Sequence, residues 1–492
     1  MTATLEPSRP HAAEVHLEHH HGGYESAGER AVVAAHAHFP ALDGLRAVAV
    51  LAVVTTHSAF ITGRYLRGPG TDVLARFDSG VAIFFVLSGF LLVRPWLTAA
   101  ATGGASPSVR TYARRRFFRI WPAYAVAVAI ALLGLPENRG SGVMDWVHHL
   151  LLVQIYHDGW LKEGLTQCWS LATEVSFYAL LPLIGWALVR WSRRTGWDPV
   201  RLLGVCVALM ILPAFWHLFL HNTTREAFKL GSFWLPSYIG WFAGGMAIAV
   251  IHTHLHRHPP VQRSVWWFAE RLGHHPFTCW GLGAAVFALT LNASSGPRGI
   301  ITATTAQAIT KESLYLVMAV LLVWPAVFGQ HPLTLRLLAN RPMRYAGDLS
   351  YGVFLYHLAI LHTVMRLTDT PVWTGSALTA LTLTLLATLP LAALSFRFLE
   401  TPLIAFAHRP STRAARAQDQ PAPAASATPL APERSEGAGM SPEESAPGAP
   451  IAQAARSAAP ARGARLSLRP APRGRRVEAP RSSRAPRGRH ER

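Results

Sequence analysis

Long apolar runs separated by short polar breaks occupy the chain from about residue 41 to residue 407. Each run approaches the ~20 residues that an α-helix needs to cross a bilayer. A further apolar stretch, 148–156, is too short to span and is predicted to be re-entrant or interfacial. The predicted fold is therefore an all-α, polytopic membrane protein. The pattern predicts about ten transmembrane helices, near residues 42–62, 79–98, 119–135, 169–190, 200–220, 231–252, 275–292, 309–329, 347–367 and 376–405.

Two polar segments flank the apolar region. Residues 1–40 are polar and include a cluster of three histidines, His19 to His21, for which no folded metal site is indicated. The segment 408–492 is rich in Ala, Pro and Arg, and it contains no aromatic residue after Ser411. Segments of this composition cannot bury enough apolar surface to fold. We predict disordered N- and C-terminal tails around a membrane domain at 41–407, and no removable signal peptide.

Composition agrees with a chain that faces lipid. Of the 492 residues, 50% are hydrophobic and only 15% are charged. The formal net charge of +19 could indicate nucleic acid, but the Arg residues gather in short loops and one tail, and no recognition motif accompanies them. We therefore predict the lipid bilayer, and not nucleic acid, as a partner.

Lys and Arg are unevenly distributed among the predicted loops. The loops after the second, fourth, sixth and eighth spans carry more of them than the opposite set. Because positively charged loops stay in the cytoplasm, we predict a multi-pass protein of the cell membrane with both termini cytoplasmic. The three cysteines are widely spaced and indicate neither a disulfide framework nor a zinc site. No metal is expected.

The first predicted span, LDGLRAVAVLAVVTTHS, contains two ionisable residues, Arg46 and His57. They lie 11 positions apart, which places them within about 20° of the same helical face and roughly 16 Å apart along the axis. A polar side chain this deep in a bilayer costs several kcal/mol unless it finds a partner or water. His57 is therefore a candidate functional residue. The alternative is a histidine that only hydrogen-bonds to a neighbouring helix.

The fourth predicted span, WSLATEVSFYALLP, places Glu174 at a depth similar to that of His57. Ser170, Glu174 and Tyr178 recur at intervals of four and form a polar stripe on one helical face. A carboxylate that orients and charges an imidazole makes it a general base for a hydroxyl proton. We predict His57 and Glu174 as a catalytic pair.

Other polar positions lie in predicted spans near this depth. SYGVFLYHLAI contains Tyr356 and His357, and structural hydrogen bonding is the alternative role for His357. FFVLSGFLL contains Ser88 beside Gly89, a pair that also permits close approach of helices. We predict Ser88, Tyr178, Tyr356 and His357 as substrate-binding residues.

A basic motif, RRRFFRIWPAY at 114–124, begins the third predicted span. Arg116 and Arg119 are three positions apart on a helix, so both guanidiniums can bind one polyanion. The orientation of the protein in the membrane also accounts for a cluster of Arg here, but it does not require such a helical pair.

Six motifs occur in a fixed order along the membrane region. In the order and the residues of these motifs, the chain resembles the acyltransferase-3 family of membrane enzymes. Members of this family O-acylate glycans, lipopolysaccharide, peptidoglycan and macrolides. Ala47 and Phe354 stand where Gly and Tyr are commoner in the family, and no fused esterase-like domain is expected after the last span. The motifs fall on Leu42–His57, Phe84–Phe90, Arg116–Pro122, Trp169–Tyr178, Ser350–His357 and Arg397–Pro402.

The resemblance implies an acyl-CoA donor, with acetyl-CoA the commonest choice. Its phosphates would be bound from the cytoplasm by Arg46, Arg116 and Arg119, while the thioester reaches His57. His57, supported by Glu174, is expected to deprotonate a hydroxyl of a glycan, glycolipid or macrolide acceptor, which attacks the thioester directly.

A second interpretation belongs to another class of protein. In a proton-coupled secondary transporter, His57, Glu174 and His357 would relay protons across the membrane. The chain has no internal repeat and no matched pair of broken spans, which favours the enzyme.

Overall fold

The computed structural model describes residues 38–157, 162–223, 230–298 and 303–409. The described residues form helices and connecting segments, with no strand among them, which confirms the all-α prediction. The tails predicted at 1–40 and 408–492 lie outside the described residues, except for 38–40 and 408–409. The α-helices are α2 Pro40–Ile61, α3 Thr71–Arg76, α4 Gly80–Thr102, α5 Val109–Gly134, α6 Val143–Leu150, α7 Trp169–Thr195, α8 Pro199–His221, α9 Leu235–Arg257, α10 Val265–Gly273, α11 Pro276–Thr290, α12 Thr305–Phe328, α13 Pro332–Leu338, α14 Arg341–Leu367, α15 Ala377–Ser395 and α16 Thr401–His408.

Eight helical stretches of the described chain are long and apolar enough to cross a membrane, judged by length and composition. Two of the ten predicted spans therefore differ from expectation. α11 has 15 residues and extends only about 22 Å, whereas the hydrocarbon core is about 30 Å thick. α14 has 27 residues, but polar side chains such as Tyr356, His357 and His362 lower its hydropathy. The eight stretches are 40–61, 71–102, 109–134, 166–195, 199–221, 231–257, 305–328 and 377–408.

The short apolar stretch at 148–156 does not cross the bundle. It contains only the end of α6 and a 3-10 turn at Gln154–Tyr156. Nearby ion pairs join this loop region to α14: His362 lies 3.0 Å from Glu163, and Arg366 lies 3.6 Å from Glu137. The hydrogen bond from His362 holds the pKa of the Glu163 carboxyl below its ordinary value.

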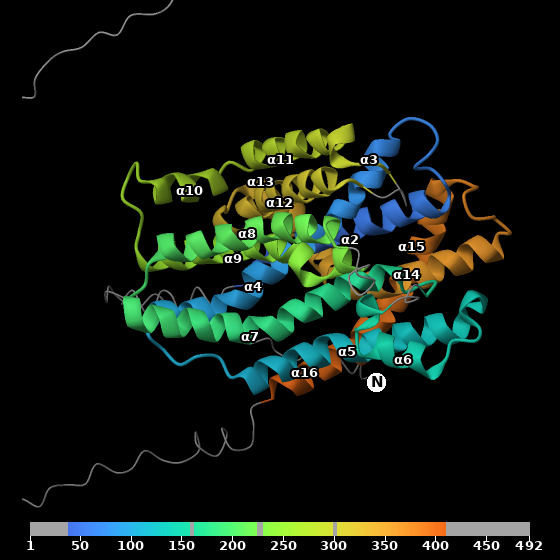
Figure 1. Ribbon diagram of the computed structural model, residues 1–492, viewed down its shortest axis with the longest axis horizontal. Coiled ribbons are helices and arrows are strands. Elements are labelled where there is room, and N and C mark those ends of the chain that lie inside the picture. Colours follow the sequence, from blue (N-terminus) through green and yellow to red (C-terminus); the bar gives the residue numbers. More distant parts are fainter. Residues whose placement is uncertain (1–37, 158–161, 224–229, 299–302, 410–492) are drawn as a thin grey trace, which may run out of the picture. The chain divides into compact units, whose positions relative to one another are not determined.

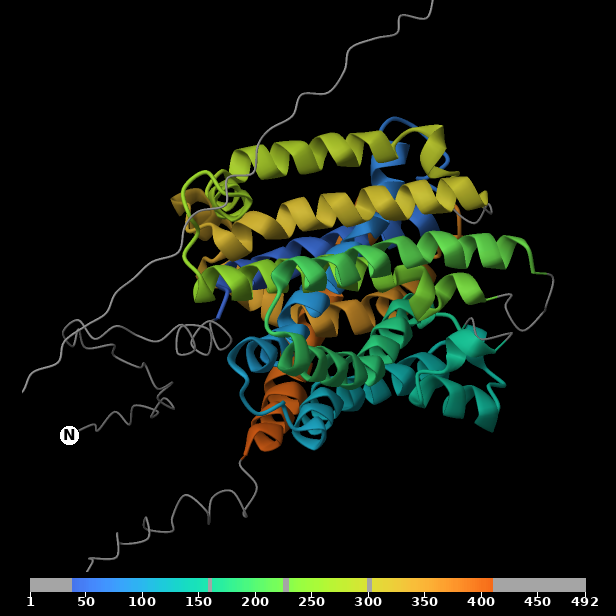
Figure 2. The same cartoon turned by 60° about the vertical axis from the view of Figure 1, so that its left-hand side comes forward.

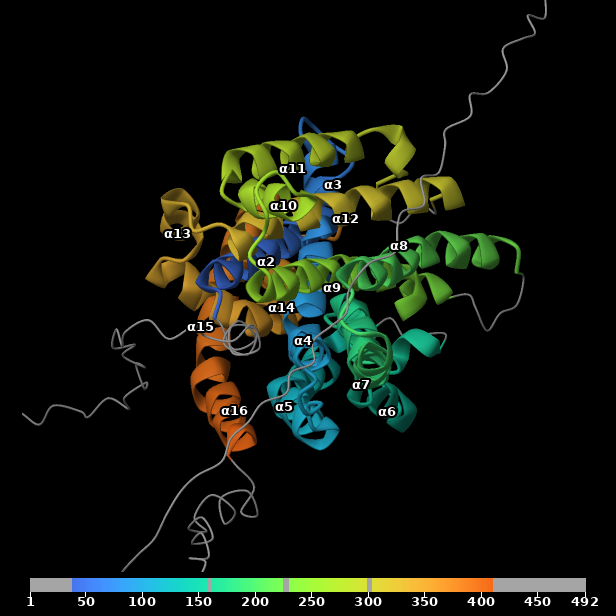
Figure 3. The same ribbon diagram turned by 90° about the vertical axis from the view of Figure 1, so that its left-hand side faces the viewer.

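The helix α4 lies in the interior of the bundle and packs against α2, α7, α9 and α12. α2 packs in turn against α14. Figures 1 and 3 place α10 and α11 at one edge of the bundle, and α5, α6 and α16 at the opposite edge. The turned view of Figure 2 shows α16, in orange, beside the blue-green α5. The helices α2, α4, α5, α7 and α14 line a common cavity, which is described below.

Two glycines allow α4 and α9 to approach closely. A Cβ atom at Gly89 would lie 2.0 Å from the carbonyl oxygen of Phe242, and a Cβ at Gly245 would lie 2.0 Å from that of Val86. No side chain fits at either position, so the close approach predicted at Gly89 is confirmed. The adjacent Ser88 faces α7, where it donates a hydrogen bond to Glu174.

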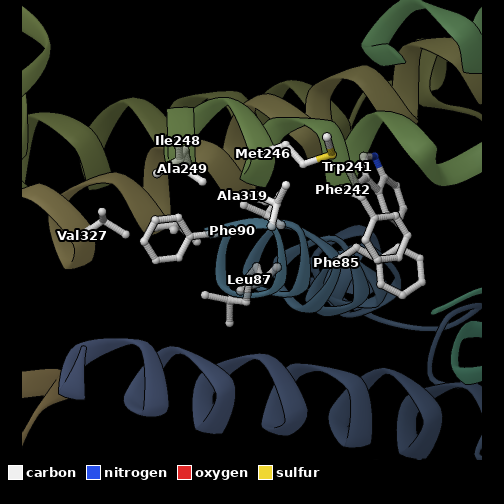
Figure 4. Packing of buried hydrophobic residues seen from close by; sticks show 14 of the residues in the cluster. Phe85, Leu87, Phe90, Trp241, Phe242, Met246, Ile248, Ala249, Ala319 and Val327 are labelled. Carbon is white, nitrogen blue, oxygen red and sulfur yellow. The ribbon is translucent and has the colours of Figure 1, made fainter. Parts of the chain in front are cut away.

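Aromatic side chains fill the space beside this helix crossing. Phe85 stacks on Phe242 with ring centroids 4.4 Å apart, and Phe242 stacks on Phe177 of α7 at 4.1 Å. Figure 4 shows Phe85 and Phe90 projecting from α4, with Trp241 and Phe242 beside Phe85. Burial of rings of this size is a major source of stability, and it holds α4 between α7 and α9.

Candidate active site

A cavity of about 270 Å³ opens between α2, α4, α5, α7 and α14. Three of its lining residues are Arg46 of α2 and Arg116 and Arg119 of α5. We call it the arginine cavity. The three arginines, predicted from two separate motifs, are therefore brought to one space, as required for a shared anion.

The three arginines differ in their partners. Arg46 forms an ion pair with Asp43 at 2.9 Å, and Arg119 lies 3.7 Å from Glu400. Within the described part of the chain, Arg116 has no acidic partner at ion-pair distance, and its buried Nε has no hydrogen-bond partner. A guanidinium left in this state is suited to bind an anion such as phosphate.

Glu174 also lines the arginine cavity. Its Oε1 accepts hydrogen bonds from Ser88 of α4 and, at 2.7 Å, from the hydroxyl of Tyr178. Ser170 lies one turn earlier on α7, so the polar stripe predicted from the sequence does face the interior. Glu174 therefore holds two hydroxyl groups, Ser88 and Tyr178, at the wall of this cavity.

A second cavity of about 170 Å³ is lined by His57, and we call it the histidine cavity. The two cavities share three lining residues: Val81 of α4, Ser170 of α7 and Phe354 of α14. The two cavities are therefore adjacent, and we call the three shared residues the neck. Because Arg46 and His57 lie on one face of α2 about 16 Å apart, the neck lies between a basic end and a histidine end of the site.

His57 bonds to a second histidine. Its Nδ1 lies 2.9 Å from Nε2 of His357, and the two rings stack with centroids 5.1 Å apart. Nδ1 of His357 lies 3.0 and 2.8 Å from the carbonyl oxygens of Val353 and Phe354. Since carbonyls only accept, Nδ1 of His357 carries hydrogen and its Nε2 accepts from His57. The network therefore leaves Nε2 of His57 as an unprotonated nitrogen that can take a proton.

The arrangement around His57 differs from the predicted pairing with Glu174. In the described structure the two residues line different cavities, and His57 is oriented by His357, which is fully buried. His57 and Glu174 lie at similar depths on their helices, but they are not brought together, because Glu174 lies on the arginine side of the neck. His357 thus has the structural hydrogen-bonding role that was its alternative.

Tyr356 lines neither of the two cavities. Its hydroxyl lies 3.0 Å from Oγ of Ser395, which donates at 3.3 Å to Glu400, the residue facing Arg119. Glu400 is 2% exposed and ends a π-helical turn at Phe396–Glu400. Tyr356 was predicted to bind substrate. It is instead linked to Arg119 by polar contacts through Ser395 and Glu400.

The sequence pattern of the acyltransferase-3 family, described as an acyltransferase domain, matches residues 39–397. The chain belongs to this family. The resemblance inferred from the six motifs is thereby confirmed, and family membership supports the predicted enzyme class, an acyltransferase. The transporter interpretation gains no support. Among the described residues, no group of three or more His, Cys, Asp and Glu could hold a metal ion.

Several curated proteins are similar in sequence to this chain. The chain is 26% identical over 394 residues to the peptidoglycan O-acetyltransferase OatA of Listeria monocytogenes, covering 74% of this chain and 55% of that protein. It is 35% identical over 184 residues to the acyltransferase MdmB of Streptomyces mycarofaciens, covering 34% and 43%. It is 24% identical over 384 residues to nodulation protein 10 of Rhizobium leguminosarum bv. viciae, covering 73% and 92%. The chain thus spans about half the length of OatA, and no solved structure matches it.

Sequence reasoning missed a group of polar residues in the histidine cavity of this family member. Asp78, Lys311 and Glu312 line it, and so does Gln167, which precedes the WSL motif. Lys311 and Glu312 lie within a predicted apolar span, so the argument that selected His57 could also have selected them. Asp78 and Gln167 lie at the ends of spans, where polar residues carry no such signal.

Proposed function

We propose that the chain is a membrane O-acyltransferase that moves an acyl group, most commonly acetyl, from acyl-CoA to a hydroxyl of a glycan, glycolipid or macrolide. The observation that carries this proposal is that a cavity with three arginines adjoins a cavity with an oriented histidine, with three lining residues in common. The arginine cavity offers charge for the phosphates of the donor, and the histidine cavity offers a base for the acceptor.

The donor would enter from the arginine end. Arg116 binds a phosphate of acyl-CoA together with Arg46 and Arg119, and the pantetheine arm extends toward the neck. The ~16 Å between Arg46 and His57 along α2 suits an extended arm of this kind. Ser88 and Tyr178, held by Glu174, are placed to hydrogen-bond to the arm or to the thioester.

The chemical step follows from the tautomer of His57. Nε2 takes the proton of the acceptor hydroxyl while the oxygen attacks the carbonyl carbon of the thioester. The carbon–sulfur bond then breaks, and the CoA thiolate takes the proton from the imidazolium. His357 accepts the hydrogen bond from Nδ1 of His57 and keeps the ring in this orientation. An O-acyl ester and free CoA are the products, with no net proton released.

We further propose that the arginine end of the bundle faces the cytoplasm, with both termini on that side of the cell membrane. Acyl-CoA is a cytoplasmic metabolite, and the loops rich in Lys and Arg lie at this end. Arg114 donates a hydrogen bond to the carbonyl oxygen of Arg409 at 2.8 Å, so the last described residue lies beside α5. His38 lies 3.2 Å from Asp43, the partner of Arg46. Both ends of the described chain are thus near the arginines.

Acyl turnover by membranes tests this function. Membranes that contain the protein are incubated with acetyl-CoA labelled in the acetyl group, and labelled ester and free CoA are measured against membranes that lack it. We expect acetyl-CoA to be consumed with label appearing in a membrane or added acceptor. Solute uptake driven by a proton gradient, without consumption of acetyl-CoA, would instead support a transporter.

Replacement of Glu400 is expected to weaken donor binding. Glu400→Gln keeps an acceptor for Ser395 but removes the charge that faces Arg119. We expect the KM for acetyl-CoA to rise about 3- to 10-fold, or about 0.7–1.4 kcal/mol, with kcat little changed, because Arg119 is less well positioned. Steady-state kinetics in membranes measures this. An equal loss of kcat at unchanged KM would contradict the positioning role.

Replacement of Phe354 is expected to change the preferred acyl chain. The ring forms part of the neck, against which the acyl group must lie while it passes between thioester and acceptor. Phe354→Ala should raise the ratio of hexanoyl to acetyl transfer at least about 10-fold, an effect of the size expected for one methylene in a fitted pocket. Phe354→Tyr, which keeps the ring, is the control and should retain the wild-type preference. An unchanged ratio in Phe354→Ala would show that the neck does not select the acyl chain.

A further inference from the structure

A groove of about 550 Å³ lies between α7, α8 and α9, and we call it the α7–α8 groove. None of the residues that line it lines the arginine cavity or the histidine cavity. On α7, Glu174 and Tyr178 line the arginine cavity, whereas Leu180 and Ile184 line the groove. The two spaces therefore lie on different faces of this helix, and the acyl-transfer steps above do not use the groove.

The groove exists because α7 and α8 separate after the short loop that joins them. α8 packs along α9, and α7 packs against α4, but α7 and α8 are not among the closely packed helix pairs of the described chain. The start of α7 is held near α9, because Thr173 donates a hydrogen bond to the carbonyl oxygen of Phe233 at 2.6 Å. Leu188 and Ile239 are buried at the floor of the groove, while Val205 is exposed at its rim.

The open side of the groove faces the region that lipid would occupy. α8 is apolar enough to span a membrane, yet only 17% of its apolar window is buried inside the protein. The side chains that line the groove are aliphatic or aromatic, and none of them is charged. A hydrocarbon chain is the chemical match for such a surface. Because lipid tails are as apolar as leucine, the lining accepts an acyl chain but does not select one lipid headgroup over another.

Arginines extend the lining stripe of each helix toward the joining loop. The lining residues of α7 recur at intervals of four and three, and Arg194 continues the stripe three positions after Trp191. On α8, Arg201 precedes the lining residue Val205 by four positions. Residues at these spacings share one helical face. The groove is therefore apolar along its length and basic at its end.

Both arginines can bind an anion. Arg194 is exposed and has no acidic partner at ion-pair distance in the described chain. Arg201 is 56% exposed and contacts Asp198 through Nε at 2.9 Å, which leaves its terminal amino groups as donors. Residues 190–201 contain four arginines and one acid, so the local charge is positive. A guanidinium has the geometry to donate two hydrogen bonds to one phosphate.

The basic end of the groove lies at the same end of the bundle as the arginine cavity. Arg193 donates a hydrogen bond at 3.0 Å to the carbonyl oxygen of Gly104, in the segment that leads into α5 and its basic motif. Trp191 lies one turn from Arg194 on the side of the apolar lining, as is typical of Trp at the membrane–water interface. With this end in the cytoplasm, as proposed above, the arginines meet the leaflet whose anionic lipids make its surface negative.

We propose that the α7–α8 groove binds one anionic glycerophospholipid of the cytoplasmic leaflet. One acyl chain lies between α7 and α8, and the phosphate contacts Arg194 and Arg201. The charge of the arginines supplies the selectivity, since the apolar lining does not distinguish lipids that carry the same chains. The lipid is a structural ligand and not a substrate, because the groove shares no lining residue with either cavity. The proposal does not depend on the acyltransferase function.

Lipid binding to the purified full chain tests this site. The protein in a neutral detergent is titrated with phosphatidylglycerol or with phosphatidylcholine that carries the same two oleoyl chains, and bound lipids are counted by native mass spectrometry. We expect one phosphatidylglycerol to bind with a dissociation constant at least about 5-fold below that of phosphatidylcholine, the effect of one or more cations near an anionic headgroup. Equal binding of the two lipids would overturn the proposal.

Charge variants then locate the headgroup. Arg194→Gln and Arg201→Gln should each weaken the binding of phosphatidylglycerol about 5-fold and leave that of phosphatidylcholine unchanged. Two separate substitutions keep the test available if one variant does not accumulate. Arg115→Gln, at an exposed position of α5 outside the groove, is the matched control and should bind phosphatidylglycerol as the wild type does. Wild-type binding in both groove variants would overturn the proposed site.

A steric variant tests whether an acyl chain enters the groove. Ala187→Phe places a ring among the lining residues and should weaken the binding of either lipid at least about 5-fold, because the chain and the ring cannot share the space. Ala208→Phe, at an exposed position of α8 outside the groove, is the control and should bind as the wild type does. Light scattering measures the oligomeric state of the same samples. If Ala187→Phe dissociates a wild-type dimer and leaves lipid binding unchanged, the groove is an interface between copies, and the proposal is overturned.

Discussion

The substitution His57→Ala is expected to reduce kcat for acyl transfer about 10²- to 10⁴-fold, the usual contribution of a positioned general base. The physical reason is that hydrogen bonds fix the tautomer of His57 in the histidine cavity. His357 accepts a hydrogen bond from Nδ1 of His57, so Nε2 of His57 is free to take the proton of the acceptor hydroxyl. Without the imidazole, the acceptor hydroxyl must attack as a neutral alcohol. The measurement is the rate of ester formation from labelled acetyl-CoA at matched protein levels.

A control distinguishes loss of the base from damage to the fold. His221→Ala replaces an exposed histidine at the end of α8 and should leave the rate unchanged. The KM for acetyl-CoA in residual turnover by His57→Ala should also stay near the wild-type value, because the arginine cavity is intact. Wild-type kcat in the His57→Ala protein would remove the basis of the proposed mechanism.

The substitution Arg116→Ala is expected to raise the KM for acetyl-CoA about 10- to 100-fold. A hydrogen bond to a charged group contributes about 1.5–3 kcal/mol, and among the three cavity arginines Arg116 is the one with no acidic partner at ion-pair distance in the described chain. Its charge is therefore available to a phosphate, whereas Arg46 and Arg119 share theirs with Asp43 and Glu400. At saturating donor, kcat should change much less, because the phosphates are remote from the reacting carbonyl.

The neighbouring Arg115 offers a matched control for this measurement. Arg115 is exposed and lines neither cavity, so Arg115→Ala removes the same charge from the same helix without removing a ligand contact. Its KM should stay near the wild-type value. Equal effects of the two substitutions would indicate general electrostatic attraction at this face, and no effect of Arg116→Ala would exclude it from donor binding.

Local patterns in the chain were sufficient for the helical fold and for much of the arginine cavity. The length of each apolar run predicts a span, and the spacing of Arg46 and His57 places them on one face of α2. The separation of Arg116 and Arg119 likewise predicts two guanidiniums on one side of α5. These properties depend only on helix geometry, which acts over a few turns.

Which side chains face one another across the helix bundle could not be predicted from local patterns in the same way. Depth in a membrane can be counted from the end of a span, and by this measure Glu174 and His57 matched. The angle at which each helix presents its side chains depends on packing, such as the glycine crossing of α4 and α9 at Gly89 and Gly245. Packing placed Glu174 beside Ser88 on the arginine side of the neck, away from His57.

The sequence by itself therefore determined an all-helical membrane protein of the acyltransferase-3 family, because hydrophobic length and motif order are written along the chain. Only the tertiary structure decided that His57 is oriented by His357, a residue 300 positions away, and that Glu312 and Gln167 share its cavity. The reason is that contacts between helices far apart in the sequence depend on how their surfaces pack, and no local sequence pattern specifies which helix faces pack together.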